Sequence, residues 1–152
     1  MIEAKIKEMG ISLPEAPKPL ASYIPAMVVD NLVFTAGQVP LEAGKMKYEG
    51  KAGENVSLED AQNAAKLCAV NCLSVVKSAI GSLDKIKRIV KITVFVASGQ
   101  GFTDQPKVAN GASDFLVDLF GEEGKHVRSA VGVSELPLNA TVEIEMIAEI
   151  EK

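Results

Sequence analysis

The chain has 152 residues, a usual length for one domain with a substantial hydrophobic core. Its formal net charge of -4 argues against a nucleic-acid-binding or anionic-membrane surface, because either partner requires a basic patch. No apolar run approaches the roughly 20 residues that cross a bilayer, and the start of the chain lacks the apolar region of a secretory signal, so we expect a cytoplasmic protein that binds no membrane.

The N-terminal third alternates predicted helix, loop and strand. Its predicted elements are a short amphipathic helix at 2–9, strands at 26–29 and 32–38, and a third short strand around 46–48. Gly10 ends the helix, and the four prolines between 14 and 25 favour an extended loop. We expect one domain over residues 1–152, with residues 1–12 as a helical N-terminal extension.

The longest predicted helix spans residues 57–80 and begins with a capping-box pattern at Ser57. Small side chains recur on one of its faces, so the helix can lie close to a sheet. Cys68 and Cys72 belong to this face. Their spacing points both thiols the same way, which is poor disulfide geometry, and His126 is the only histidine available for a metal. We therefore expect buried thiols and no metal site.

The second half of the chain predicts alternating strands and one more helix. The expected elements are a strand at 86–97, a helix at 106–120, and two strands at 126–137 and 140–149. Taken with the first half, this order is typical of an α+β fold: one mixed β-sheet with two helices packed on one face.

Arg128 and a series of glutamates are the most informative polar residues. Arg128 occurs among alternating valines and alanines, and its guanidinium carries donors that suit a carboxylate held by two hydrogen bonds. In the last strand, strand period 2 puts Glu143 and Glu145 on the face opposite the apolar residues. Other strands are apolar on both faces, so the uncovered face of the sheet is expected to pack against another copy of the chain.

Three motifs follow one another along the chain. They are Gly37-Gln38-Val39-Pro40, then Arg128-Ser129, and then Leu136-Pro137 followed by Val142-Glu143-Ile144-Glu145. With the β-rich run at 90–96, this combination resembles the Rid family of reactive intermediate deaminases, also called YjgF-like or L-PSP endoribonuclease proteins. The resemblance covers about residues 20–150, and the N-terminal helix suggests a longer branch.

The resemblance implies a chorismate-mutase-like (YjgF-like) α+β fold, assembled as a homotrimer with ligand clefts between subunits. It implies hydrolysis of reactive enamines and imines, such as 2-aminoacrylate, to 2-oxo acids and ammonia. Neither a metal nor an organic cofactor is implied, and the ligand is a small molecule with a carboxylate.

Six residues take roles by this resemblance. Arg128 clamps the substrate carboxylate, and Glu143 positions or activates the attacking water. Tyr23 lines the cleft, Gly37 presents a backbone group, and Asn110 matches a family asparagine if the length difference in that stretch is placed correctly. The sixth, Ala130, is a cleft position at which active relatives usually carry Cys.

Ala130 and Ala36 depart from the family pattern, since active relatives commonly have Ser in place of Ala36. Both departures make the cleft more apolar, so the substrate is expected to be larger or less polar than 2-aminoacrylate, or turnover is absent. A non-catalytic binding protein for small carboxylates is the alternative function, and an endoribonuclease is a weaker one because no basic stripe is present.

Structural explanations stay open for the same residues. Arg128 can form an ion pair with Glu143 or Glu145 across the sheet, and the glutamates can form a solvated strand face. Tyr23 can pack over the sheet edge, and Gly37 can serve a bulge.

Overall fold

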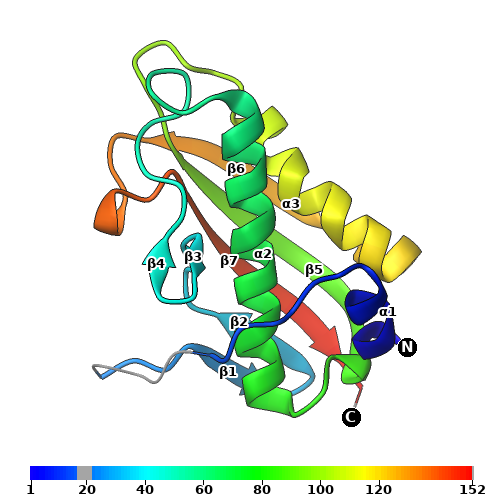
Figure 1. Cartoon of the computed structure of the whole chain (residues 1–152). Coiled ribbons are helices and arrows are strands. Elements are labelled where there is room, and N and C mark those ends of the chain that lie inside the picture. The colour runs from blue at the N-terminus through cyan, green and yellow to red at the C-terminus, as the bar shows by residue number, and fades with distance from the viewer. Residues whose placement is uncertain (17–21, 152) are drawn as a thin grey trace.

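The computed structural model describes residues 1–16 and 22–151 and has two layers, a five-stranded β-sheet and two helices that cover one of its faces (Figure 1). In chain order the elements are α1 (Ile2–Glu8), β1 (Ala26–Val29), β2 (Leu32–Thr35), β3 (Leu41–Glu42), β4 (Lys45–Met46), α2 (Leu58–Ile80), η1 (Leu83–Lys85), β5 (Ile86–Ala97), α3 (Gln105–Phe120), η2 (Gly121–Gly124), β6 (Val127–Val133), η3 (Pro137–Asn139) and β7 (Val142–Ile150). The predicted α+β fold is confirmed.

The strand order in the main sheet is β1-β2-β7-β5-β6. Only β5 and β6 are parallel, because α3 carries the chain back between them as a crossover; the other neighbours are antiparallel. Ile92 of β5 lies opposite both Arg128 of β6 and Met146 of β7. Because directly opposed residues share a face of the sheet, this register identifies the side chains of β6 that face the helices.

The hydrophobic core lies between the helices and the sheet. Alanines and cysteines of α2 allow a close approach to β7, where the thiols of Cys68 and Cys72 donate to the carbonyl oxygens of Val142 and Ile144 at 3.4 and 3.3 Å. Burial raises the pKa of the Cys72 thiol to about 12, so this group stays protonated. The prediction of buried, unpaired thiols is confirmed.

The other face of the sheet is rich in exposed apolar side chains, because both long helices of the described chain lie on the opposite side (Figure 1). Met27, Phe34, Val127 and Val131 have exposed fractions between 38% and 65%. The register places Phe34 opposite Met27 and Ile147, so these apolar residues form a continuous row. We call this surface the open face.

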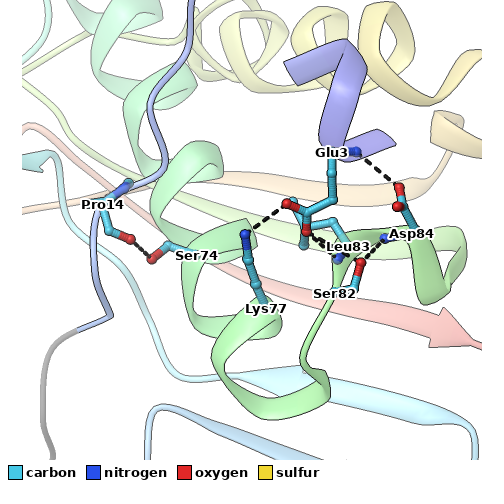
Figure 2. A network of polar contacts seen from close by, with 7 residues as sticks. All are labelled: Glu3, Pro14, Ser74, Lys77, Ser82, Leu83 and Asp84. Atoms are coloured by element: carbon cyan, nitrogen blue, oxygen red, sulfur yellow. Dashed lines mark hydrogen bonds and ion pairs between the residues drawn. The ribbon is translucent and has the colours of Figure 1, made fainter. Parts of the chain in front are cut away.

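Helix α1 packs against the helix layer and not against the open face. Figure 2 shows how its first turn is attached: the Glu3 carboxylate accepts hydrogen bonds from Lys77 Nζ and from the Leu83 N–H, both at 2.8 Å. In return the N–H of Glu3 donates to Asp84 Oδ1 at 3.0 Å. Further along, the Ser74 hydroxyl donates to the carbonyl of Pro14. These contacts anchor the N-terminal extension to α2 and η1.

Several predicted boundaries were wrong. The strand expected at 46–48 is instead β4, which pairs with β3 in a separate hairpin and does not join the main sheet. Strand β2 ends at Thr35, and only a bridge from Gln38 to Ile144 continues the pairing. Strand β6 ends at Val133, four residues before the expected end at 137; residues 134–136 are irregular, and the 3-10 helix η3 begins at Pro137. Within the described residues, no helix has the length and apolar character needed to cross a membrane.

Candidate functional site

Arg128 lies on the helix-facing side of β6 and is held by three groups of α3. Its Nη1 donates to Asn110 Oδ1 at 2.9 Å and to Ser113 Oγ at 3.0 Å. Its Nη2 donates to the carbonyl oxygen of Pro106 at 3.2 Å. Asn110 and Ser113 are three residues apart, so one helix face presents both. The structure therefore brings Asn110 and Arg128 together.

The hydrogen bonds of Arg128 leave one edge of its guanidinium available. A guanidinium has five N–H donors, and the described residues engage three of them: both on Nη1 and one on Nη2. The two that remain are the Nε–H and one Nη2–H, and these two nitrogens form one edge of the guanidinium. That pair matches the two oxygens of a carboxylate. Ala130 follows on the same side of β6, opposite Val94, and is partly buried against the core.

Behind Arg128 lies the only histidine of the chain. His126 Nε2 is 2.9 Å from Ser113 Oγ, and its Nδ1 is 2.6 Å from the carbonyl oxygen of Gly124. Burial lowers the pKa of His126, and the nearby Arg128 charge lowers it further, against the opposing effect of the Gly124 hydrogen bond. The imidazole is therefore neutral at pH 7.

Glu143 projects from β7 onto the open face, where it lies opposite Phe95 of β5. Burial raises the pKa of its carboxyl group, and repulsion by Glu145 adds to the effect. The pKa is therefore shifted toward neutrality, the direction that suits a group that exchanges a proton near neutral pH.

Gly37 lies directly against the Glu143 side chain. The backbone hydrogen bonds between Gln38 and Ile144, at 2.8 and 2.9 Å, bring the two segments together. A Cβ atom added to Gly37 would overlap the Glu143 carboxylate, and its φ is not in the left-handed region. Glycine is thus required here for the close approach of Glu143, rather than for a strained turn.

Tyr23 is close to the same end of the open face. The carbonyl oxygen of Pro25 accepts a hydrogen bond from the N–H of Ala36 at 2.7 Å, so the segment before β1 runs beside the segment that leads to Gly37. The Tyr23 side chain is 61% exposed and packs little within one chain. Gly37 and Glu143 therefore form one group at the open face, and the segment that carries Tyr23 runs beside the segment that leads to Gly37.

Arg128, Asn110 and Ala130 form a second group on the other side of the sheet. Arg128 shares its face with Ile92, whereas Glu143 shares its face with Phe95, and strand residues of opposite parity point in opposite directions. The alternative of an ion pair between Arg128 and Glu143 or Glu145 is excluded within one chain.

Reasoning from the sequence missed Ser113 and His126, although their spacing offered signals. Ser113 follows Asn110 by three residues, and His126 precedes Arg128 by two.

Two cavities among the described residues lie away from both groups. One, of about 470 Å³, is lined by the segment around Gly10–Pro14, the β3–β4 hairpin and α2; the other, of about 550 Å³, lies between α1 and the end of α3. Neither is lined by any of the six predicted site residues. Among the described residues, no three His, Cys, Asp or Glu side chains converge as metal ligands would.

Comparison with known proteins connects these groups to a family. The family model described as "YjgF/chorismate_mutase-like, putative endoribonuclease" matches residues 3–150. A crystal structure of Atu1372 from Agrobacterium tumefaciens, a protein of unknown function, is 46% identical with a TM-score of 0.92 and covers 99% of this chain and 92% of that one.

Two curated relatives span nearly the whole chain. Protein TCP17 of Trypanosoma cruzi is 39% identical over 150 residues, which cover 98% of this chain and 94% of the relative. The 2-iminobutanoate/2-iminopropanoate deaminase of Dermatophagoides farinae is 33% identical over 141 residues, which cover 93% and 95% of the two chains.

Proposed function

Because the chain belongs to the YjgF/chorismate mutase-like family, we propose that it hydrolyses reactive enamines and imines of the 2-aminoacrylate type to 2-oxo acids and ammonia. The observation that carries the proposal is the free edge of Arg128, which is presented by three contacts from α3 and fits the carboxylate that all such substrates share. A relative named as a 2-iminobutanoate/2-iminopropanoate deaminase supports this substrate class.

The reaction would take place in clefts between the copies of a homotrimer. Arg128 and Glu143 lie on opposite faces of one sheet, so a small substrate cannot touch both within one chain. The exposed apolar side chains of the open face favour burial against another copy, which would bring Glu143 of one subunit beside Arg128 of its neighbour. In this assembly Tyr23 and Gly37 would line the cleft with Glu143.

The proposed chemistry uses water alone. Arg128 and Asn110 would orient the substrate carboxylate, and Glu143 would accept a proton from a water molecule while the oxygen attacks the imine carbon. With the imine nitrogen protonated at the start, this attack would give a neutral carbinolamine. Glu143 would return the proton to the nitrogen, and as ammonia leaves, the carbinolamine hydroxyl would pass its proton to the Glu143 carboxylate, which leaves the 2-oxo acid. A carboxylate with a raised pKa is suited to both transfers. Neither a metal nor a cofactor is needed, because the imine carbon is already electrophilic.

The cleft wall favours a substrate with a larger or less polar side chain than 2-aminoacrylate. Ala130 lies on the same side as Arg128, and Ala36 precedes Gly37, so two apolar methyl groups occupy positions at which active relatives carry Cys and Ser.

These two alanines also favour the alternative, a binding protein for small carboxylates that lacks turnover. Ammonia release separates the two functions. An endoribonuclease would require an RNA surface that an acidic chain lacks, and salt-sensitive RNA binding would reveal it. We propose the cytoplasm as the compartment, because its reducing conditions suit two unpaired thiols.

The experiment generates imines in situ with an amino-acid oxidase, while semicarbazide competes for the free imine. Imine loss and ammonia release are followed with wild-type protein and with Arg128→Ala, across small, branched and aromatic parent amino acids. Faster hydrolysis with the wild type, lost in the variant, would support the deaminase. No acceleration on any parent amino acid, by protein shown to be a folded trimer, would reject it for these substrates.

A further inference from the structure

A chain of hydrogen bonds behind Arg128 has one direction when the imidazole of His126 is neutral. Arginine donates and cannot accept, so Ser113 Oγ accepts from Nη1 at 3.0 Å. The carbonyl of Gly124 only accepts, so Nδ1 of His126 carries a hydrogen and donates it across 2.6 Å. Burial and the Arg128 charge lower the pKa of His126, so Nδ1–H is the one N–H of the ring and Nε2 is an acceptor. The Ser113 hydroxyl then donates to Nε2, 2.9 Å away.

The far end of this chain is fixed by packing. Gly124 is buried in η2, and a Cβ atom added to it would overlap the carbonyl oxygen of Leu116 in α3. Its own carbonyl is therefore held at a set place relative to α3, and the imidazole is held by that carbonyl. Within the described residues, Arg128 is the charged group that acts on His126. Its charge lowers the pKa of the ring, and burial lowers that pKa more, so both keep the ring neutral.

We propose that His126 is a positioning residue for Arg128, acting through Ser113 to set which edge of the guanidinium faces the substrate carboxylate. With the Ser113 hydroxyl turned toward the imidazole, its lone pairs face Nη1, which also binds Asn110. Both hydrogens of Nη1 are then occupied, and the Nε–Nη2 edge is left for the ligand. This inference rests on the proposed function, in which Arg128 binds the carboxylate, and it adds two residues that do not touch substrate.

The test measures the dissociation constant of 2-oxobutanoate, a product-like carboxylate, and kcat/KM for imine hydrolysis. Ser113→Ala and His126→Leu are each expected to weaken both by about 3- to 10-fold, the usual effect of losing one hydrogen bond. The double variant is expected to be no weaker than either single variant, because both remove the same interaction. His126→Gln, which keeps an acceptor for the Ser113 hydroxyl, is expected to recover most of the loss.

Ser78→Ala, at an exposed serine near the end of α2, is the matched control and is expected to equal the wild type. Multiplicative losses in the double variant, or no rescue by His126→Gln, would assign His126 a general packing role and overturn the proposal. Unchanged values in both single variants would overturn it as well. Arg128→Ala is measured alongside: if it binds and turns over as the wild type does, the proposed function itself fails, and the positioning role fails with it.

A second measurement covers variants that fold poorly. The chain has one histidine, so its imidazole C2–H gives one assignable NMR signal. Saturation with 2-oxobutanoate is expected to shift this signal and to raise the pKa of His126, because a bound carboxylate offsets the Arg128 charge. In Arg128→Met both responses are expected to vanish. A His126 signal that does not respond to the ligand in the wild type would overturn the proposal.

Discussion

Arg128 and Glu143 project from opposite faces of one β-sheet, although both are needed for the proposed reaction. The register fixes this relationship: Ile92 is opposite Arg128, and Phe95, of the other parity, is opposite Glu143. A site that uses both residues must therefore combine two copies of the chain. Subunit-mixing experiments can test this requirement directly.

Mixed trimers of Arg128→Ala and Glu143→Gln chains are expected to regain activity that neither variant has alone. In the proposed assembly, each cleft would take Arg128 from one subunit and Glu143 from another. After random reassembly of equal amounts, about a quarter of the clefts combine the two intact residues, so activity near a quarter of wild type is expected. The measurement is imine hydrolysis after co-expression of the two chains. Persistent inactivity of well-folded mixed trimers would contradict a shared cleft.

Gly37→Ala is expected to reduce kcat for imine hydrolysis by roughly 10- to 100-fold, because the new methyl group displaces the Glu143 carboxylate from its place. The matched comparison is made in a Glu143→Ala background. There, Gly37→Ala is expected to have no further effect, because the group that it displaces is absent. A further loss in that background would mean that Gly37 acts on the substrate independently of Glu143.

Glu143→Gln is expected to remove activity and, in dissociated single chains, where no Arg128 of a neighbour offsets the charge, to raise the melting temperature at pH 7. Burial raises the folded-state pKa of Glu143, so the charged form is disfavoured in the folded protein. The destabilisation of the wild type by the charged Glu143 therefore depends on pH. It is absent below the unfolded-state pKa, about 4.3, and it grows as pH rises through the folded-state pKa. Thermal unfolding across pH checks this expectation. A stabilisation that persists equally at pH 4 would point to a cause other than charge burial.

Sequence patterning predicts the faces of β7 but not those of β6. Glutamates alternate with apolar residues along β7, so its buried side was evident. In β6, Val127 and Val131 are more apolar than Ala130 and Gly132, yet the valines are exposed and the small residues face α3. Local hydrophobicity cannot distinguish a face that packs on a helix from one that is suited to another subunit. The motifs supplied Arg128 and Glu143, but their opposite faces required the register.

The contacts of Ser113 and His126 were beyond sequence reasoning for a different reason. Each residue alone is unremarkable in its element, and their meeting depends on how α3 crosses β6 and on where η2 places Gly124. Spacing places Ser113 beside Asn110 and His126 beside Arg128, but it does not predict that the two pairs meet. The anchoring of α1 is similar, since Glu3 and Lys77 are 74 residues apart.

Glu3→Ala is expected to destabilise the protein by about 1 kcal/mol, because it removes contacts with Lys77 and the Leu83 N–H that are partly screened by solvent. The melting temperature should fall by about 2–4 °C. The hydrogen bond from Lys77 is the main cause of the lowered pKa of Glu3, so this stabilisation is present above the unfolded pKa and is lost as pH falls through the folded-state value. Glu8→Ala, at an exposed position of the same helix, is the matched control and should leave the melting temperature unchanged. Helix α1 packs on the helix layer away from both site groups, so Glu3→Ala should leave imine hydrolysis at 25 °C unaffected. A large loss of activity in this variant would show that α1 takes part in the cleft.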